Sequence, residues 1–487
     1  MTGKTISHYR ILEKLGGGGM RNGHRMCLSR GRVGSLNGYS MKLTCLILMV
    51  LSLHRGAGNV HARETPKPGV KLKFIIILSR HGVRSPTWDT EELNQYSAEP
   101  WPQWDVPPGY LTPHGKTLMK LFGAYDRAFL AQAGLLSPSG CGNADQVYFW
   151  ADNDARTLET GRALAAGMLP DCAVETHSLP QGTDDAVFSP ITAGVGRANR
   201  NLAAAAVLGR IGGNPGALLE AYRPALEKMQ QVLLGCKPGA PCPPDGKAVR
   251  HSLLDVATSV GPGEGDHLAE FSGPLHTAST LAEDFLLEYA NGMADNEVGW
   301  GRINESNLRQ MMSLHLVYAD LLRRTPYLAR VQASNLLSHI LKTMEQAVLG
   351  RRIPGGLGKP GTLVVVIVGH DTNLDNVAGT LGLSWLIEGF QRDDTAPGGA
   401  LVFELWRQPV SGEHTVRTYY MSQTLEQMRK GLPLTLNSPP AKAPIFLPGC
   451  STATEGLACG WKAFQHTIAT AIDRAYVQPQ NGPRTSD

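Results

Sequence analysis

The 487-residue sequence lacks three features that would each point at once to a class of protein. Its longest largely apolar stretch, Leu43–Leu53, is too short to span a bilayer. Its fifteen histidines show no His-Glu-x-x-His or comparable ligand spacing. It contains no internal repeat of the kind that builds solenoids and propellers. The sequence therefore offers no signature of an integral membrane protein, a metal enzyme or a repeat scaffold.

Excess positive charge is also absent once the N-terminus is set aside. The net charge is +4, but residues 1–62 contain nine Lys and Arg and a single acid. The rest of the chain, with 37 basic and 41 acidic residues, has a net charge of −4. Such a balance gives no general attraction for nucleic acid or for an anionic membrane, so we expect neither as a partner. An anionic ligand must then meet a local basic site.

Residues 41–62 have the pattern of a secretory signal peptide. They begin with Met-Lys, continue through the apolar stretch and end in a small-x-small-like site at Val60–Ala62. We expect a periplasmic or secreted protein with no membrane contact after the leader is removed; the alternatives are a membrane anchor or a buried segment.

Residues 1–40 resemble the opening of bacterial serine/threonine kinase domains, but no V-A-I-K, H-R-D or D-F-G motif follows. We interpret residues 1–40 as a misassigned or non-native extension.

Six cysteines follow the leader, an even number that suits a disulfide framework in an exported protein. Six cysteines allow fifteen pairings, and sequence alone does not choose among them. We predict nearest-neighbour pairing because it closes short loops: Cys141–Cys172, Cys236–Cys242 and Cys450–Cys459.

Three short runs of β-branched and aromatic residues predict buried strands: Lys73–Ser79, Gln146–Ala151 and Thr362–Val368. Each run ends at a polar cluster. Parallel strands present their carboxyl ends at one edge of an α/β sheet, where such sheets build their sites. The sequence therefore predicts an α/β fold with a mainly parallel sheet flanked by helices, in which three polar clusters converge.

Helical periodicity fills the segments between these strands. The predicted helices are Pro113–Leu136, Ala155–Met168, Gly216–Leu234, Leu281–Tyr289 and Asn307–Ala347. Since strand signals fade from 192 to 354, we expect an α-helical subdomain (192–354) inserted between two parts of an α/β catalytic domain (63–191 and 355–487). Strand patterns at Leu401–Arg407 and Arg417–Ser422 predict an antiparallel addition to the sheet.

The first polar cluster contains Arg80, His81 and Arg84 directly after the first strand. An imidazole beside two guanidinium groups is unfavourable unless an anion joins them, and guanidinium geometry matches phosphate oxygens. His81 would then attack phosphorus through an unprotonated nitrogen and form a covalent intermediate. Taken alone, the loop is equally consistent with surface ion pairs of the arginines around an incidental histidine.

Polar residues follow the other two strands as well. We expect Asp371 to protonate the leaving alkoxide, with His370 as a phosphate contact. Arg156 would complete a cage of three guanidinium groups around one phosphoryl group. The alternative is that Asp371, and either Asp152 or Asp154, only cap the following helices, which is a common role for Asp.

The motif RHGxRxP after an early strand, together with a late GHDTN, resembles the histidine acid phosphatase family, branch two of the phosphoglycerate-mutase-like fold. The resemblance continues through LTPHG, ADNDARTLETGRALAAGMLPDC, RTPYLARVQA, PGGALVFELWR and QTLEQMR. It covers residues 70 to 475 and is most similar to bacterial periplasmic phytase/acid phosphatases.

The resemblance implies a role for each residue of the site. His81 corresponds to the nucleophile and Asp371 to the proton donor, and the implied phosphate-binding residues are Arg80, Arg84, Thr87, Arg156 and His370. Asp152, Met293 and Glu297 are the implied pocket residues, although the segment 292–300 is two residues longer than in the enteric phytases. Trp88 stands where the enteric pattern has a basic side chain, and an aromatic ring there would stack on a sugar or an aryl leaving group.

We therefore expect an acid phosphomonoester hydrolase of the phytase/acid phosphatase type, a monomer that forms a phosphohistidine and needs no cofactor or metal. Its substrates would be phytate, sugar phosphates or aryl phosphates. Two alternatives stay open: a sugar-phosphate phosphatase of the glucose-1-phosphatase type, and a non-catalytic phosphate-ester-binding protein, which would leave Asp371 unexplained.

Overall fold

The computed structural model describes residues 5–6, 9–10, 69–235, 252–254 and 257–479. The chain divides into two compact units, Met1–Glu64 and Thr65–Asp487. In the first unit the described residues form two short paired strands, β1 (Thr5–Ile6) and β2 (Tyr9–Arg10). The predicted signal peptide and most of the predicted extension lie outside the described residues.

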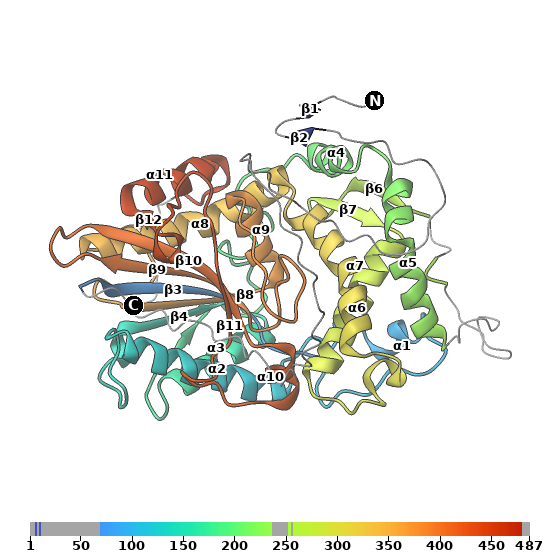
Figure 1. Ribbon diagram of the computed structural model, residues 1–487, viewed down its shortest axis with the longest axis horizontal. Helices are drawn as coiled ribbons and strands as arrows, with labels where there is room; N and C mark the ends of the chain where they lie inside the picture. Colours follow the sequence, from blue (N-terminus) through green and yellow to red (C-terminus); the bar gives the residue numbers. More distant parts are fainter. Residues whose placement is uncertain (1–4, 7–8, 11–68, 236–251, 255–256, 480–487) are drawn as a thin grey trace, which may run out of the picture. The chain divides into compact units, whose positions relative to one another are not determined.

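A mixed sheet forms the centre of the second unit (Figure 1). Its strand order is β11-β10-β9-β3-β8-β4-β5, and the short β12 also pairs with β10. The strands β3, β8, β4 and β5 run parallel, whereas β9, β10 and β11 are added antiparallel beyond β3. The strands are β3 (Lys71–Arg80), β4 (Val147–Ala151), β5 (Thr176–His177), β8 (Val364–Gly369), β9 (Ala400–Arg407), β10 (His414–Ser422), β11 (Ala441–Pro444) and β12 (Cys459–Gly460). The predicted α/β fold, its three buried strands and its antiparallel addition are confirmed.

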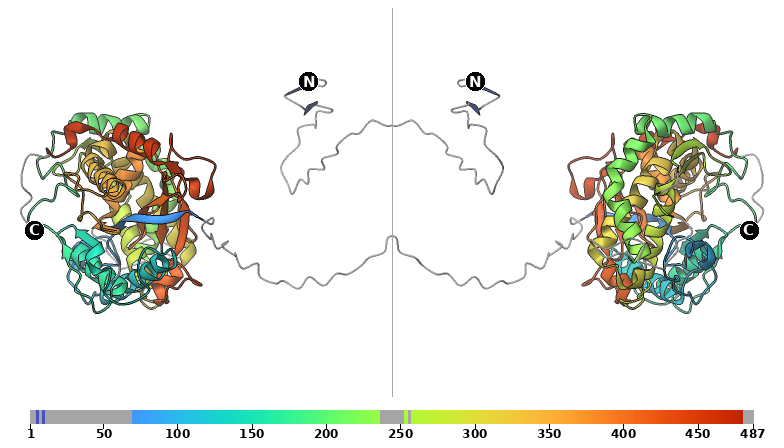
Figure 2. Two further views of the ribbon diagram at one scale, coloured as in Figure 1. Left: turned by 90° about the vertical axis from the view of Figure 1, so that its left-hand side faces the viewer. Right: turned by 90° about the vertical axis from the view of Figure 1, so that its right-hand side faces the viewer.

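The side chains of β3 alternate between two hydrophobic cores. Ile75 and Ile77 face one core, shared with α2 (Pro113–Gln132) and α3 (Ala155–Met168). Phe74, Ile76 and Leu78 face the other, which holds α8 (Pro326–Leu349), α9 (Asp371–Leu381) and α11 (Trp461–Ala471). Figure 2 shows these two helical layers on opposite faces of the sheet. A strand buried on both faces is apolar at nearly every position, which is the pattern in its sequence.

Helices α2 and α3 begin as predicted. Thr112 accepts a hydrogen bond from the Gly115 N–H, and Pro113 occupies the first helical position, where its missing N–H costs nothing. Helix α2 ends at Gln132, four residues before the predicted end, while α3 has the predicted bounds.

Helices α4 to α7 pack beyond one end of the sheet (Figure 1). The helices of this region are α4 (Arg200–Arg210), α5 (Pro215–Leu234), α6 (Pro274–Ala290) and α7 (Glu305–Arg323). Two features were not predicted: helix α4, and the hairpin of β6 (Ser259–Pro262) with β7 (Ala269–Ser272). Two short helices, α1 (Thr90–Leu93) and α10 (Leu425–Lys430), complete the set described here.

The stretch Asn307–Ala347, predicted to be helical, forms two helices, because Pro326 separates α7 from α8 (Pro326–Leu349). Proline lacks the N–H that a continuous helix needs, and it disfavours helical geometry at the residue before it. Helix α8 then packs against α9 and β3. The domain boundaries at 192 and 354 stay predictions.

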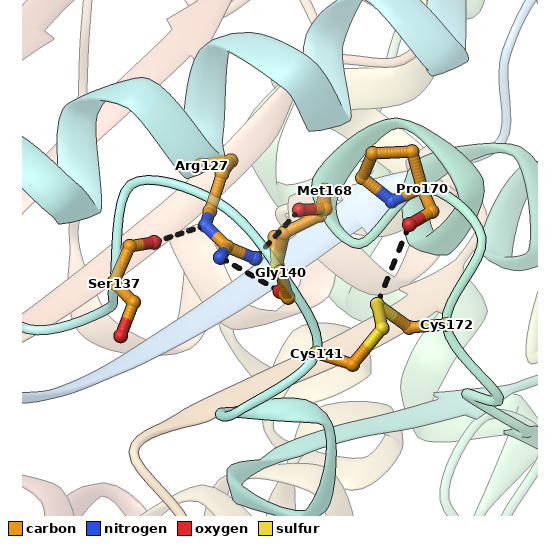
Figure 3. The surroundings of a disulfide bond; sticks show 7 residues. All are labelled: Arg127, Ser137, Gly140, Cys141, Met168, Pro170 and Cys172. Carbon is orange, nitrogen blue, oxygen red and sulfur yellow. Dashed lines mark hydrogen bonds between the residues drawn. A yellow bond between two sulfur atoms is a disulfide. The ribbon is translucent and has the colours of Figure 1, made fainter.

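Two of the three predicted disulfides are present. Cys141 is bonded to Cys172 and Cys450 to Cys459, whereas Cys236 and Cys242 lie outside the described residues. Beside the first disulfide, Arg127 of α2 donates hydrogen bonds to carbonyl oxygens of the loop after α2 and of the end of α3 (Figure 3).

Within the described ranges, no single helix has both the length and the apolar character of a membrane span. The pair α4 and α5, bent by 59° between them, meets those two criteria only when taken together.

Candidate active site

The three predicted clusters meet at one edge of the sheet. In the strand register Arg80 lies beside Gly369, and Ala151 beside Val368, so β3, β8 and β4 end at the same level. The ladder extends one residue further, because the His81 N–H donates to the Gly369 carbonyl at 2.9 Å. The rings of His81 and His370 are 5.7 Å apart, centre to centre. Parallel pairing thus joins segments nearly 300 residues apart in the sequence.

His81 is buried, with 2% of its surface exposed. Its Nδ1 lies 2.9 Å from the carbonyl oxygen of Gly82, which can only accept, so Nδ1 carries the proton and Nε2 keeps its lone pair. Burial, and then the charges of Arg80, Arg156 and Arg84, lower the pKa of His81 well below its usual value. The imidazole is therefore neutral in mildly acidic solution, which is the state required of a nucleophile.

Gly82 is required by packing. A Cβ atom at this position would lie 2.7 Å from Cγ of Met119 on α2, closer than such atoms approach one another. The turn after β3 therefore lies directly against the Met119 side chain of α2.

Arg80 and Arg84 share one carboxylate. Glu283 of α6 forms an ion pair with Arg80 through one oxygen and lies 2.9 Å from Arg84 through the other. Burial raises the pKa of Glu283, but the two arginines outweigh it and bring the pKa to about 2. Both guanidinium groups are thus held side by side by an ionised acid from the helical region.

Arg156 and His370 form the opposite wall with two acids. Arg156 lies 2.6 Å from Asp154 and 3.3 Å from Nδ1 of His370, while His370 Nε2 lies 2.8 Å from Asp152. Asp154 occupies the N-cap position of α3, but its side chain makes no capping hydrogen bond. Neither acid therefore serves as a helix cap through its side chain.

Asp371 is the first residue of α9, and His370 occupies the N-cap position. Oδ1 of Asp371 nevertheless accepts a hydrogen bond from the Thr372 N–H at 2.8 Å, so Asp371 satisfies one backbone donor of the first turn without being the N-cap residue. Its Oδ2 lies 2.7 Å from Arg323 and 3.7 Å from Arg80, and His315 Nε2 is 4.0 Å away. Burial raises the pKa of Asp371, but Arg323, Arg80 and His315 outweigh it and hold the pKa well below its usual value. The carboxylate is ionised in this arrangement.

Thr87 and Trp88 lie at the rim. Thr87 is exposed. The loop at Gly109 passes beside Thr87 and Arg156, because a Cβ atom added to Gly109 would lie 3.7 Å from the Thr87 methyl group and 3.8 Å from Nη1 of Arg156. Trp88 stacks on Tyr96, with ring centres 5.8 Å apart.

Met293 and Glu297 contact residues of the helical region and α10. The carbonyl of Met293 accepts a hydrogen bond from Arg429, and Glu297 accepts one from the backbone of Ala294 in its own turn. The pocket roles of these two residues stay predictions.

Among the residues that the structure describes, two groups of side chains have ligand atoms close enough for a metal ion: Asp152, Asp154 and His370, and Glu283, His315 and Asp371. Asp152 is paired with His370. The other three carboxylates, those of Asp154, Glu283 and Asp371, are already paired with guanidinium groups. Those fixed positive charges oppose a further cation and favour an anion at the same place.

Sequence reasoning missed Glu283, His315 and Arg323. They lie on α6 and α7, where helical periodicity gave no reason to single out an individual residue. The available signal was a charged residue within an apolar helical run, such as Glu283 in STLAEDFLLEYA.

The family model "Histidine phosphatase superfamily (branch 2)" matches residues 71–208 and 284–421. The chain is 36% identical over 407 residues to phytase AppA of Escherichia coli (strain K12), spanning 83% of this chain and 93% of that protein. It is 28% identical to a glucose-1-phosphatase of Salmonella typhimurium, spanning 88% of this chain and 100% of that protein.

A solved structure of Hafnia alvei phytase in complex with tartrate superimposes with a TM-score of 0.77 at 34% identity, covering 85% of this chain and 100% of that one. The same phytase in complex with myo-inositol hexakis sulphate has a TM-score of 0.74 at 33% identity over the same shares.

Proposed function

The chain belongs to branch 2 of the histidine phosphatase superfamily and is a histidine acid phosphatase, a phosphomonoesterase; within that class we propose that His81 is its nucleophile and phytate its substrate. Asp371 is the proposed proton donor. Arg80, Arg84, Thr87, Arg156 and His370 are the proposed phosphate-binding residues.

One observation carries the assignment of His81. Its Nδ1–H is anchored on the Gly82 carbonyl while burial and three neighbouring arginines keep the ring neutral. The same arginines that prevent protonation of the imidazole attract the phosphoryl group that it attacks. Nucleophile and electrophile are thus brought together by one set of charges.

In the first step Nε2 of His81 forms a bond to phosphorus as the ester P–O bond breaks. The three guanidinium groups stabilise the charge on the phosphoryl oxygens in the transition state. A phosphate ester that binds Arg80 and Arg84 competes with Glu283, which pairs with both arginines in the structure.

The leaving alkoxide takes a proton from Asp371. Water then attacks the phosphohistidine, the P–N electron pair returns to Nε2, and the proton from water passes to Asp371. This sequence regenerates the enzyme with no outside reactant except water. Protonated Asp371 matters most for alcohols of high pKa, whose alkoxides leave poorly without a proton.

Phytate is supported by two relatives over most of the chain: a protein named as a phytase, and another phytase solved with an inositol hexakis sulphate. Trp88, stacked on Tyr96 at the rim, favours a second candidate, a sugar phosphate carried by an aromatic surface. The glucose-1-phosphatase relative, at lower identity, supports that alternative.

We also propose that the enzyme is exported to the periplasm or secreted, and that it acts as a monomer. The two disulfides support export, since disulfides persist in oxidising compartments. The predicted leader at residues 41–62 supports it independently.

The test uses chain beginning at Arg63, assayed in mildly acidic buffer with phytate, glucose 1-phosphate and p-nitrophenyl phosphate. The highest kcat/KM is expected for phytate. Asp371→Asn should slow phosphate release from phytate and glucose 1-phosphate far more than from the aryl ester, whose leaving group needs no proton. A preference for glucose 1-phosphate would contradict the substrate assignment, and equal losses on all three would contradict the role of Asp371.

A further inference from the structure

The proposed proton donor shares a guanidinium group with a second acid. Nη1 of Arg323 lies 2.7 Å from Oδ2 of Asp371 and 3.4 Å from Oδ2 of Asp375. The two acids are one turn apart on α9, and Arg323 comes from the end of α7, which packs against α9 (Figure 1). All three side chains are largely buried. One nitrogen therefore bridges two carboxyl groups.

The charged and titratable groups that face Asp371 come from five elements. They are Arg80 of β3, Arg156 of α3, Glu283 of α6, His315 and Arg323 of α7, and Asp375 of α9. Arg323 is the nearest cation, and it opposes protonation of Asp371 most strongly. An ionised Asp371 has no proton to donate, so something must weaken this ion pair before the leaving group departs.

Asp375 is in the opposite state. Burial raises its pKa to about 7, Arg323 and Arg324 act against that rise, and Asp371 adds to it. Asp394, and Tyr420 of β10, also face Asp375. In mildly acidic solution Asp375 is therefore neutral, and it competes weakly for Arg323. The two acids hold one proton between them, and it resides on the acid that is further from the proposed reaction.

We propose that Arg323 is a positioning residue that controls the proton on Asp371 by transferring its ion pair from Asp371 to Asp375 when a phosphate ester binds. The inference rests on the proposed role of Asp371 as proton donor. The bound ester places negative charge beside Asp371 and engages Arg80, and both effects favour the neutral form of Asp371.

The proton count balances within the pair. Asp375 loses a proton and becomes the partner of Arg323, while Asp371 gains a proton. Asp371 then gives that proton to the leaving oxygen as the P–O bond breaks, and it recovers one from the attacking water. When phosphate leaves, Asp375 is protonated again and Arg323 returns to Asp371.

A purely structural ion pair between α7 and α9 makes a different prediction. Losing it would lower stability and affect every substrate equally at every pH. A residue that controls the proton on Asp371 instead changes the pH dependence, and it does so only for substrates whose leaving group needs a proton.

The test measures the rate of alcohol release in single turnovers at saturating substrate, from pH 3 to pH 8. The two substrates are 2-glycerophosphate, a poor leaving group, and p-nitrophenyl phosphate, a good one. In Arg323→Gln the pH at which the rate with 2-glycerophosphate falls on the alkaline side of its pH profile (the alkaline limb) should rise by about one unit or more. Such a shift corresponds to a tenfold rise in the proton affinity of the acid. Arg323→Lys, which keeps the charge, should stay nearer to the wild type. The limb for p-nitrophenyl phosphate should not move in either variant.

Asp375→Asn provides a second and opposite test. With no acid able to take over the ion pair, Arg323 stays on Asp371. The rate with 2-glycerophosphate should fall about tenfold or more, corresponding to at least one pH unit at Asp371, while the rate with p-nitrophenyl phosphate is kept. This variant tests the inference even if Arg323→Gln fails to fold, as judged by circular dichroism.

Arg309→Gln is the matched control. Arg309 also lies on α7, but it is exposed and paired with Glu305. Its loss should leave both pH profiles unchanged. An unshifted 2-glycerophosphate limb in Arg323→Gln, or equal shifts for both substrates, would overturn the inference. Failure of the proposed function looks different, because Asp371→Asn would then hydrolyse 2-glycerophosphate at the wild-type rate.

Discussion

Asp284 makes the stability of the folded protein depend on pH. It lies next to Glu283 on α6 with 1% of its surface exposed, and its Oδ2 has no hydrogen-bond partner among the described residues. Burial raises the pKa of Asp284 to about 8, Arg84 acts against the rise, and Glu283 adds to it. Folding therefore places a carboxyl group where only its protonated form is favourable.

The sign of the effect follows from proton counts. Between the ordinary carboxyl pKa near 4 and the folded value near 8, the folded state holds a proton that the unfolded state has released. The stabilising contribution is thus complete below about pH 4 and is lost as pH rises through 8, at about 1.4 kcal/mol per pH unit. From pH 5 to pH 7 this single group removes about 3 kcal/mol.

Asp284→Asn replaces the protonated acid by a neutral group of the same shape, which does not titrate. Urea unfolding followed by tryptophan fluorescence at pH 5, 6 and 7 should show that the variant gains about 1.4 kcal/mol per pH unit relative to wild type. Glu227→Gln, at an exposed position of α5, is the control and should show no such trend. The reasoning is refuted if the difference in unfolding free energy between Asp284→Asn and wild type changes by less than about 0.5 kcal/mol from pH 5 to pH 7.

Two further predictions follow from the site and the disulfides. Arg156→Lys keeps the charge but loses the planar fork, so kcat/KM for phytate should fall by about 10²-fold while the urea midpoint changes little, as steady-state kinetics and unfolding would show. A fall in kcat/KM of less than about threefold would contradict a direct contact between Arg156 and phosphate. Replacing Cys141 and Cys172 by Ser opens a loop whose ends are 31 residues apart and should cost about 3–4 kcal/mol of unfolding free energy. An unchanged urea midpoint would contradict that contribution.

The sheet and its three polar clusters were predictable because they depend on local patterns. Buried parallel strands are apolar at nearly every position, and the polar cluster begins where each strand ends. His81, Arg156 and His370 each lie within a few residues of such a strand end, so one rule found all three. The family resemblance then gave each residue a role.

The partners of these residues were not predictable, because they arrive through packing. Glu283 and Arg323 lie on helices whose sequences predict only an amphipathic surface, and they reach the site when α6 and α7 pack against the end of the sheet. Arg80 and Glu283 are about 200 residues apart in the sequence. No local sequence pattern shows whether such a charged residue forms an ion pair or is solvated. The break between α7 and α8 was visible in principle, since Pro326 follows Thr325, but the long apolar pattern on both sides concealed it.

The most direct test of the account is to trap the covalent intermediate. Phytate labelled in its phosphate groups would be mixed with the enzyme and quenched in alkaline denaturant, where a P–N bond survives, and the digested chain would be examined for labelled peptides. The account predicts label on the peptide that contains His81, at no more than one phosphate per chain, and none in His81→Ala. Hydrolysis by His81→Ala at the wild-type rate, or label on a different residue, would contradict it.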